Sequence, residues 1–497
     1  MKASKWLLSI MAASLLLFHA APEPASAAMT PYESYNYNYW EEAVPAPAPY
    51  VPERSVSGAD LGIGSLLEPT DMFVSSDEQL YIVDSGNNRV IHLDSHWNVK
   101  RIISEFDNNG QSDQFQKPNG LYINDEGNLY IADTEKRRVV ILSQEGHLLG
   151  IIENPQSDIL PEDYKFVPLK VAVDNANRVY VVAQGVYEGI MQFDVDGEFI
   201  GYVGTNKVTP DYTEFLWRLI STEAQQAQMV LFVPTEFSNL DLDSKGFVYA
   251  TNIDPDSKEP VKRLNPTGAD VLKRFGYFDV VGDIIFRRVV GPSKLIDVKV
   301  LENGMYSVLD SSQGKIFTYN DTGDLLYVYG GKGNQVGTFK IPAAIEYLGD
   351  KRLVLDRGRG NIVVFKPTTF GASVNEAVGL HYNGYDVEAV PLWHEVLKLN
   401  ANYDIAYIGI GKSLLMDKRN KEALAYFKLG MDRKGYSVAY KRYRREIMQE
   451  HSGTFLTAVL VIAAALLAYK LTGLWRRKRM STASHFASQS LKEGKTP

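Results

Sequence analysis

Apolar and polar residues alternate in short runs over most of the chain, and the runs form a unit that recurs about every fifty residues. Each unit starts with a proline and holds short apolar strands separated by polar or glycine-containing turns. The spacings of these prolines are 49, 50, 66, 58 and 50 residues, for Pro69, Pro118, Pro168, Pro234, Pro292 and Pro342. Six such units predict an all-β, six-bladed propeller over residues 58–370. Residues 50–57 are expected to supply the outer strand that closes the last blade.

The second strand of the clearest units ends on an aspartate. In LYIVDSGNNRVIHL this residue is Asp84, and in LYIADTEKRRVVIL it is Asp133. Asp310 and Asp356 occupy similar places in later units, whereas Gln184 and Asn252 stand near the position in two others. Aspartate at a turn accepts hydrogen bonds from backbone N–H groups, and we expect this structural role here.

These motifs resemble the NHL repeat, whose six-bladed propellers have a Pro-Gly-like opening, a strand end of the YVAD type and an Asn-Arg-Val step. The resemblance covers residues 66–370 and is clearest in the first two units. Some NHL propellers bind RNA through a basic face. Residues 29–370 contain 31 Lys and Arg against 48 Asp and Glu, a net charge of −17, so we expect no nucleic-acid partner.

The longest proline spacing contains a segment that the repeat does not require. Residues 207–232 include TEFLWRLISTEAQQAQMV, which has the apolar spacing and composition of a helix. Connections between rigid repeats often carry function. Two interpretations remain open: a lid packed on its own propeller, or a contact with a partner made by Phe215, Leu216, Trp217 and Leu219.

Helical periodicity replaces the strands after Phe370. Residues 371–449 resemble two tetratricopeptide repeats, because Ala389 and Ala423, like Trp393 and Phe427, stand 34 residues apart. The resemblance implies a helical groove lined mostly by apolar residues, either docked on the propeller or open to a partner. The expected groove positions are Val374, Val378, His381, Ile408, Lys412 and Leu415.

The two ends of the chain predict export and membrane attachment. Residues 1–27 have the basic start, short apolar run and small residues of a signal peptide. Residues 453–475 are long and apolar enough to cross a bilayer, and the basic residues 476–479 begin a tail, 476–497, that is expected to be cytoplasmic. This topology predicts a single-pass protein of the cell membrane with its propeller outside. Residues 28–57, rich in Tyr and Pro, are expected to form an extended linker before the closing strand.

Residues that could bind a metal or a solute are expected where the inner strands begin, since these strands line the centre of a propeller. Counting from the opening prolines places five polar side chains at this mouth: Asp71, Asn119, Lys170, Glu236 and Lys294. Pro118-Asn119-Gly120 is similar to a strand start in gluconolactonase-type propellers, which implies a metal-dependent lactonase or hydrolase as an alternative. Two lysines in the same mouth fit a salt-bridged channel or a site for a polar solute better than a metal cage.

We therefore expect a membrane-anchored binding or scaffold protein without a cofactor or bound metal, and not an enzyme. The chain has no cysteine, which excludes disulfides and thiolate chemistry. The expected partner is a protein at the cell envelope, in an envelope transport or assembly complex, with a small polar ligand as a second option. The residues do not identify that partner.

Overall fold

The structure is a computed structural model that describes residues 30–155, 157, 159–160, 164–204, 222, 235–254, 257–286 and 288–490, with side chains described to residue 480. The expected signal peptide and nearly all of the insertion at residues 207–232 lie outside this part. The chain divides into two compact units, residues 1–406 and 407–497. Each unit is described by itself below.

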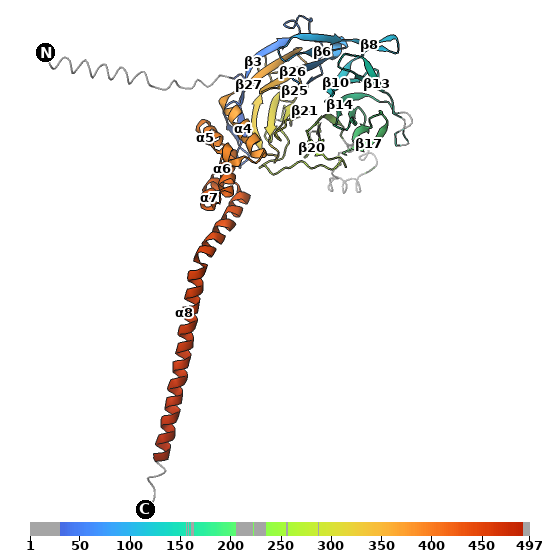
Figure 1. Cartoon of the computed structure of the whole chain (residues 1–497). Helices are drawn as coiled ribbons and strands as arrows, with labels where there is room; N and C mark the ends of the chain where they lie inside the picture. Colours follow the sequence, from blue (N-terminus) through green and yellow to red (C-terminus); the bar gives the residue numbers. More distant parts are fainter. Residues whose placement is uncertain are drawn as a thin grey trace, which may run out of the picture. The chain divides into compact units, whose positions relative to one another are not determined.

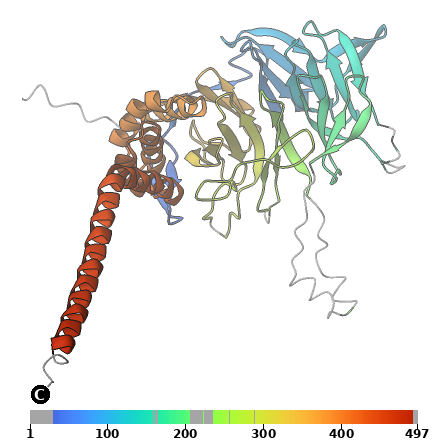
Figure 2. The ribbon, with the colours of Figure 1, turned by 60° about the horizontal axis from the view of Figure 1, so that its bottom comes forward.

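The first unit is a propeller whose described strands form six blades around a ring (Figures 1 and 2). Blade 1 contains β4 (Asp71–Val74), β5 (Leu80–Asp84), β6 (Arg89–Leu93) and β7 (Val99–Ile103). Blade 2 contains β10 (Pro118–Ile123), β11 (Leu129–Asp133), β12 (Arg138–Leu142) and β13 (Leu148–Ile152). Blade 3 contains β14 (Pro168–Val173), β15 (Val179–Ala183), β16 (Ile190–Phe193) and β17 (Phe199–Val203). The hairpin of β8 (Glu105–Asn108) and β9 (Gln111–Gln114) connects the first two blades.

The second half of the ring departs more from the repeat. Blade 4 contains β18 (Phe237–Leu242), β19 (Val248–Asn252) and β20 (Val261–Leu264). Blade 5 contains β21 (Leu295–Val300), β22 (Tyr306–Asp310), β23 (Lys315–Tyr319) and β24 (Leu325–Gly330). Blade 6 contains β25 (Pro342–Leu348), β26 (Lys351–Asp356), β27 (Asn361–Pro367) and β3 (Tyr50–Ser57). Every inner strand contacts the inner strand of the next blade, and β25 contacts β4, so the ring is closed.

The strand that completes blade 6 comes from the other end of the propeller sequence. Strand β3 pairs antiparallel with β27, with Val56 opposite Ile362, which is the position expected for residues 50–57 (Figure 1). Val56 is buried in the same apolar cluster as Ile362 and Val364. The closure therefore rests on both backbone pairing and apolar packing between residues that are far apart in sequence.

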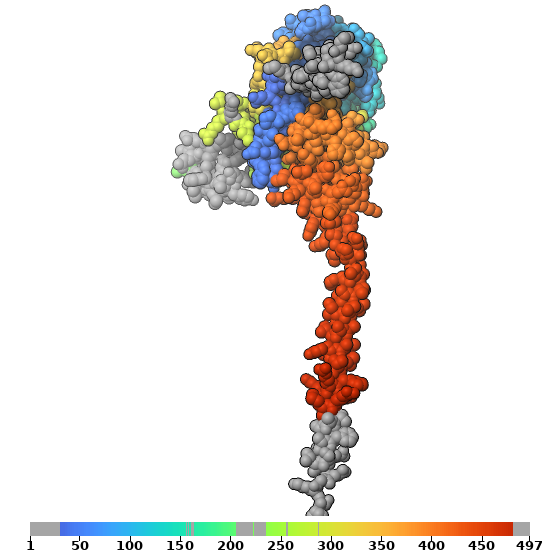
Figure 3. All heavy atoms as spheres, turned by 90° about the vertical axis from the view of Figure 1, so that its left-hand side faces the viewer, coloured from blue at the N-terminus to red at the C-terminus, as the bar shows by residue number. Residues whose placement is uncertain are grey.

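Residues 35–45 differ from the expected linker because they form a hairpin. Strands β1 (Tyr35–Tyr37) and β2 (Ala43–Pro45) pair with each other, and β1 joins β24, which extends blade 5 to six strands. The tyrosines that suggested a low-complexity linker are anchors, since the hydroxyls of Tyr35 and Tyr37 both donate to buried Asp283. Figure 3 shows the N-terminal segment in blue against later parts of the same unit.

Tight turns of five residues join the strands on one side of the ring. In each of them the first residue donates its N–H to the fifth carbonyl, as from Asp94 to Asn98 and from Asp243 to Phe247. The aspartate side chain also accepts from the third and fifth N–H groups, at 3.0 and 2.9 Å for Asp243. The fourth position needs a positive φ, which glycine adopts without strain, as Gly246 does at 77°. The connections between blades lie on the other side and vary in length.

Two helices of the first unit follow β27. Helices α4 (Thr369–Tyr382) and α5 (Asp386–Leu399) pack against each other, and α4 lies against the tight turns of blades 4 and 5. The Lys245 ammonium donates to the Tyr382 hydroxyl at 2.7 Å, and Asn375 joins the hydroxyls of Tyr50 and Tyr327 at 2.7 and 2.6 Å. Expected groove residues Val374 and Val378 are buried. This end of the expected groove is therefore occupied inside the unit.

The second unit begins within α6 (Asp404–Met416) and continues with α7 (Asn420–Leu429) and α8 (Arg433–Ser490). Phe427 of α7 packs on Gly411 of α6 and Gly435 of α8. Helix α8 has 58 residues, about 87 Å at 1.5 Å per residue. Its part from Arg433 to Met480 is, among the described helices, the one long and apolar enough to cross a membrane. The C-terminal region is thus helical and contains a candidate membrane span.

Candidate functional site: the central channel and a pocket between blades 4 and 5

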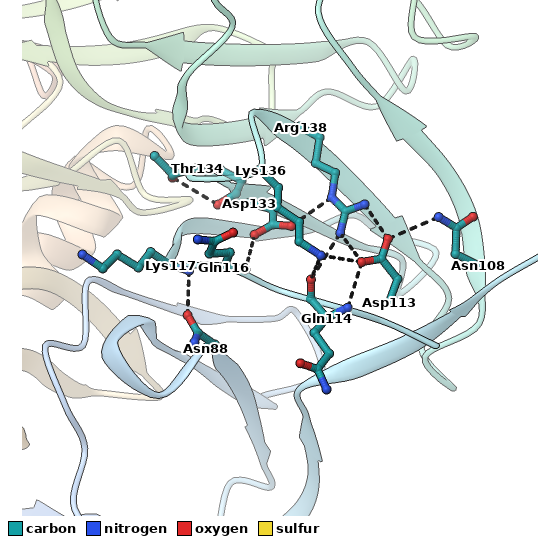
Figure 4. A network of polar contacts seen from close by, with 11 residues as sticks. Asn88, Asn108, Asp113, Gln114, Gln116, Lys117, Asp133, Thr134, Lys136 and Arg138 are labelled. Atoms are coloured by element: carbon teal, nitrogen blue, oxygen red, sulfur yellow. Dashed lines mark hydrogen bonds and ion pairs between the residues drawn. The ribbon is translucent and has the colours of Figure 1, made fainter. Parts of the chain in front are cut away.

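In four of the six blades, a buried aspartate at the end of the second strand binds the segment that precedes the blade. Asp133 is fully buried and accepts from the Gln116 N–H at 2.7 Å and from Arg138 Nε at 2.9 Å (Figure 4). Arg138 also binds Asp113 of β9 at 2.6 Å, so the charged cluster has a second acid. Arg138, Lys136 and Asn108 hold the pKa of Asp113 well below its usual range, against a smaller effect of burial. Asp84, Asp310 and Asp356 likewise accept from a backbone N–H of the preceding segment, so the aspartates have the structural role predicted from the sequence.

The inner strands form two rings of side chains around the channel. Register with the second strands places one residue of each blade in the first ring: Asp71, Gly120, Lys170, Asn239, Asp297 and Ala344. The second ring lies two residues further on and contains Phe73, Tyr122, Ala172, Asp241, Lys299 and Glu346. A Cβ on Gly120 would meet the Leu169 carbonyl oxygen at 2.5 Å. The small residue in blade 2 therefore lets the inner strand of blade 3 approach.

Carboxylates in the channel connect neighbouring blades. Asp71 accepts from the Leu121 N–H at 3.0 Å, Asp241 from the Val300 N–H at 2.9 Å, and Asp297 from the Ile345 N–H at 2.7 Å. Each bond runs from one blade to the next. Because buried N–H groups and carboxylates are costly without partners, these bonds position the inner strands relative to one another.

Two lysines balance these acids in part. In the first ring, Lys170 Nζ lies 2.8 Å from Asp71 Oδ1. In the second ring, Lys299 Nζ lies 2.9 Å from Glu346 Oε1 and 3.5 Å from Asp241 Oδ1, and it is 4.7 Å from the centre of the Phe73 ring. Four carboxylates and two ammonium groups would leave a net charge of −2 if all were ionised.

Burial of these acids shifts their protonation toward the neutral form. Burial raises the pKa of Asp297 to about 7, although nearby Lys170 acts in the opposite direction. Burial likewise raises the pKa of Glu346 to about 8, with Lys299 again opposing it. Burial also opposes the charge on Lys299, but Asp241 and Glu346 outweigh it and raise its pKa. The lysine therefore stays charged, while Glu346 tends to hold a proton near neutral pH.

The channel has little free space. The cavity between the rings measures ≈ 30 Å³, enough for about one ordered water. A solute or a substrate would have to break the ion pairs to enter. Within the described residues, moreover, no three His, Asp or Glu side chains converge as metal ligands. The channel is therefore a salt-bridged core of the ring.

The structure brings together two of the five residues predicted at the mouth. Asp71 and Lys170 form the ion pair described above, whereas Asn119 and Glu236 are half-buried and Lys294 is exposed, outside the channel lining. In blades 4 and 5 the position of Pro118 is taken by Phe237 and Leu295, three residues after the prolines that were used for the alignment.

The residues that belong at the mouth in these two blades are Asn239 and Asp297. Asn119 falls on a bulge, because the register of β10 shifts between Pro118 and Gly120. The ends of the second strands align the six repeats better than the prolines do. Counting back from Asn252 and Asp310, which end the second strands of blades 4 and 5, leads to Asn239 and Asp297. The strand-end aspartate is therefore a more reliable mark of the repeat than its proline.

A larger cavity lies between blades 4 and 5, and we call it the rim pocket. Its volume is ≈ 460 Å³. It is formed by segments that the repeat does not require: the turn of the β1–β2 hairpin, the connection between β19 and β20, and the connection between β20 and β21. The lining consists of Glu41, Asp254, Ser257, Lys258, Pro260, Gly276, Tyr277, Phe278, Asp279, Val281, Asp283, Ile284, Phe286, Pro292 and Ser293. Its volume lies within the range of small-ligand sites.

The long connection beside this pocket also substitutes for the fourth strand of blade 4. The Val271 N–H donates to the Arg263 carbonyl at 2.7 Å, and Asp270 accepts from the Arg263 N–H at 3.0 Å. The Arg274 guanidinium donates to the Val261 carbonyl at 2.8 Å. Backbone groups on the outer edge of β20 are thus hydrogen-bonded within the chain, so this edge is not available to pair with a strand of a partner. Sequence analysis missed the pocket, because its residues come from irregular segments without a motif.

The four insertion residues proposed for a partner contact, Phe215, Leu216, Trp217 and Leu219, lie outside the described residues. Their role stays a prediction.

Solved structures that resemble this one include enzymes with low sequence identity. A streptogramin B lyase matches with a TM-score of 0.38 at 12% identity, over 61% of this chain and 94% of the lyase. Virginiamycin B lyase from Staphylococcus aureus gives 0.37 at 10% identity, over 67% of this chain and 87% of the lyase. A gluconolactonase from Xanthomonas campestris gives 0.38 at 11% identity, over 65% of this chain and 99% of the gluconolactonase.

These matches correct one expectation from the sequence. We predicted that the protein is not an enzyme, but lyases and a gluconolactonase are among the structures that it resembles. The exclusion was wrong as stated, because it rested on absent motifs, and an enzymatic function remains open.

Comparison of the sequence with known families gives one further result. Among curated proteins no sequence matches the chain. The NHL repeat family matches residues 115–142, which are the segment before β10, β10 itself and strands β11 and β12 of blade 2. The matched segment contains the Asp133–Arg138 pair. The chain thus carries an NHL repeat within a six-bladed β-propeller.

Proposed function

We propose that the protein is a membrane-anchored binding protein that holds a partner or a polar ligand at its propeller on the outer side of the cell membrane. The observation that carries this proposal is the concentration of irregular segments at blades 4 and 5. There the ring gains the β1–β2 hairpin and a long connection, and these segments enclose the ≈ 460 Å³ rim pocket. Binding sites often lie on variable connections that a rigid scaffold positions.

The small volume of the channel supports the same proposal, because it excludes the channel as the ligand site. Its polar side chains bind one another across the ring, and the ≈ 30 Å³ between them cannot admit a sugar-sized solute. The proposal therefore places the ligand in the rim pocket. Exposed apolar side chains near this pocket, among them Phe275 and Phe286, add surface that a protein partner could bury.

Membrane attachment by α8 is part of the proposal. The apolar residues 455–475 would cross about 30 Å of hydrocarbon, and the basic residues 476–479 favour a cytoplasmic end. The 22 residues from Arg433 to the start of the span would add about 33 Å of helix outside the membrane. We also propose that α4–α7 are two tetratricopeptide-like repeats, since Ala389 with Trp393 and Ala423 with Phe427 occupy matching positions in α5 and α7.

The experiment that tests this function is cross-linking in intact cells followed by purification of the tagged full chain. We expect a defined envelope protein or solute to co-purify with the wild type. Recovery should fall when the pocket wall is changed by Tyr277→Ala, and it should not change in Glu302→Gln, an exposed residue of a tight turn. Equal recovery from both variants would refute a binding role for the rim pocket.

A further inference from the structure

The walls of the rim pocket combine aromatic rings with carboxylates. Four edge-to-face contacts form a chain, from Trp40 to Tyr39 at 5.2 Å, from Tyr39 to Tyr277 at 5.4 Å, from Tyr277 to Phe278 at 6.1 Å and from Phe278 to Tyr37 at 5.7 Å. The second and the fourth of these contacts join the hairpin to the connection. We call these five residues the aromatic ladder. Tyr277 and Phe278 line the pocket, and their contacts with Tyr39 and Tyr37 restrain the positions of their rings.

The charges in the lining favour a cation. Its carboxylates belong to Glu41, Asp254, Asp279 and Asp283, and its one described ammonium belongs to Lys258. Asp283 is neutralised from behind the pocket by Lys315, at 2.7 Å. Asp254 has partners of its own, among them the Thr235 hydroxyl at 2.9 Å, and Lys258 against Glu41 and Asp279 leaves a net charge of −1. An anion would be repelled, and a cation would gain from both the carboxylates and the rings.

The protein itself already places an ammonium group against one end of this wall. Lys315 Nζ lies 4.7 Å from the centre of the Tyr35 ring and 2.7 Å from Asp283 Oδ2. Among the described residues, no other carboxylate forms an ion pair with Lys315. Tyr35 in turn contacts Tyr37 of the ladder at 5.5 Å. Ring, carboxylate and ammonium thus form one arrangement beside the pocket, whose lining also contains a tyrosine, Tyr277, and a further carboxylate, Asp279.

We propose that the rim pocket binds an organic cation, an ammonium or guanidinium group, between the aromatic rings of Tyr277 and Phe278 and the carboxylates of Glu41 and Asp279. The cation comes either from a small molecule or from a lysine or arginine side chain of a polypeptide. The volume of ≈ 460 Å³ accommodates a whole quaternary ammonium or an arginine side chain. This inference rests on the proposed function, because it names the chemistry of the ligand.

The test is calorimetric titration of the full chain in lipid nanodiscs. The probes are tetramethylammonium, a capped hexapeptide that contains two arginines, and glucose as a neutral probe, all at one ionic strength. We expect at least one of the cations to bind in a single site and glucose not to bind. Binding of tetramethylammonium would assign a small-molecule ligand, and binding of the peptide alone would assign a polypeptide side chain.

Variants separate the pocket from general attraction to an acidic protein. The double change Glu41→Gln and Asp279→Asn should weaken cation binding at least tenfold, and Tyr277→Ala should weaken it with all charges retained. The matched control Glu302→Gln removes one carboxylate from a tight turn and should leave the affinity unchanged. Absence of cation binding to the wild type, or equal loss in the control, would overturn the inference.

The outcomes also distinguish this inference from the proposed function. If a partner is recovered from cells through the pocket but neither cation binds, the function stands and the cation chemistry is wrong. If a cation binds in the pocket but no partner or solute is recovered, the site is correct and the role in the membrane is not.

Discussion

At the scale of residues, the ring is held by aspartates whose partners lie in other blades or in the connections between them. Asp133 is fully buried and satisfies a backbone N–H and a guanidinium at once. Between adjacent inner strands, Asp71 accepts from the Leu121 N–H and pairs with Lys170, and Asp297 accepts from the Ile345 N–H and from the Asn239 side-chain amide. Such groups stabilise the fold only as complete sets, because the loss of one member leaves another polar group buried and unpaired.

Replacement of Asp133 by alanine should therefore be strongly destabilising. The change leaves the Gln116 N–H and the Nε of Arg138 without their acceptor, although Arg138 keeps Asp113. We expect a loss of about 3 kcal/mol in the free energy of unfolding, measured by chemical denaturation of the full chain in detergent. Asp196→Ala, in an exposed turn, should change it by less than about 0.5 kcal/mol. A small effect at Asp133 would show that the network is redundant.

The channel acids should make stability depend on pH. The pKa of Glu346 is about 8 in the folded protein and close to its ordinary value of 4.5 when unfolded. The folded state then holds more protons between these values, so stability falls as pH rises from about 4 to about 8. Glu346→Gln should make this decline less steep, by at most about 1.4 kcal/mol per pH unit. Thermal unfolding at several pH values is the measurement, and an unchanged slope would contradict the raised pKa.

At the scale of elements, the strand β3 decides whether the ring closes. It is the outer strand of blade 6, and Val56 packs in the apolar cluster that also contains Leu66 and Leu353. The pairing joins residues about 300 positions apart in sequence. Closure of so long a loop costs conformational entropy, which the burial of apolar side chains along β3 and β27 offsets.

A charged side chain on the buried face of β3 should weaken the pairing of β3 with β27 and so destabilise the closed ring. In Val56→Asp an unpaired carboxylate replaces a side chain that is 5% exposed. We expect the melting temperature of the full chain to fall by at least several degrees, with faster proteolysis after β27. Glu53→Ala on the same strand removes only an exposed ion pair with Lys351 and should have little effect. Equal stability of the two variants would mean that β3 is dispensable.

At the scale of the whole molecule, the proposed topology depends on the candidate membrane span in α8. The candidate span lies near the end of the chain, so the propeller and the tail would be on opposite sides of the membrane. Protease added to intact protoplasts should degrade the propeller and spare a tag attached at Pro497. Permeabilised protoplasts, in which the tag must also be lost, provide the control. Protection of the propeller in intact cells would reverse the proposed orientation.

The sequence by itself determined the repeat, and with it the number of blades and the role of the strand-end aspartates. These features depend on local patterns: alternation of apolar residues, turn residues at fixed offsets, and a period that survives divergence. Asp71 and Lys170 were found in the same way, because Pro168 begins β14 and Pro69 lies two residues before the start of β4. The candidate membrane span in α8 could also be predicted from the sequence, since it is defined by length and composition alone.

Only the tertiary structure decided where the other polar residues meet. Asn239 and Asp297 replace Glu236 and Lys294 at the mouth because strand pairing, and not the nearest proline, sets the register of blades 4 and 5. The rim pocket brings Glu41 close to Tyr277, more than two hundred residues later in the chain. No local pattern encodes such a neighbour, because it arises from the closure of the ring and from packing between irregular segments.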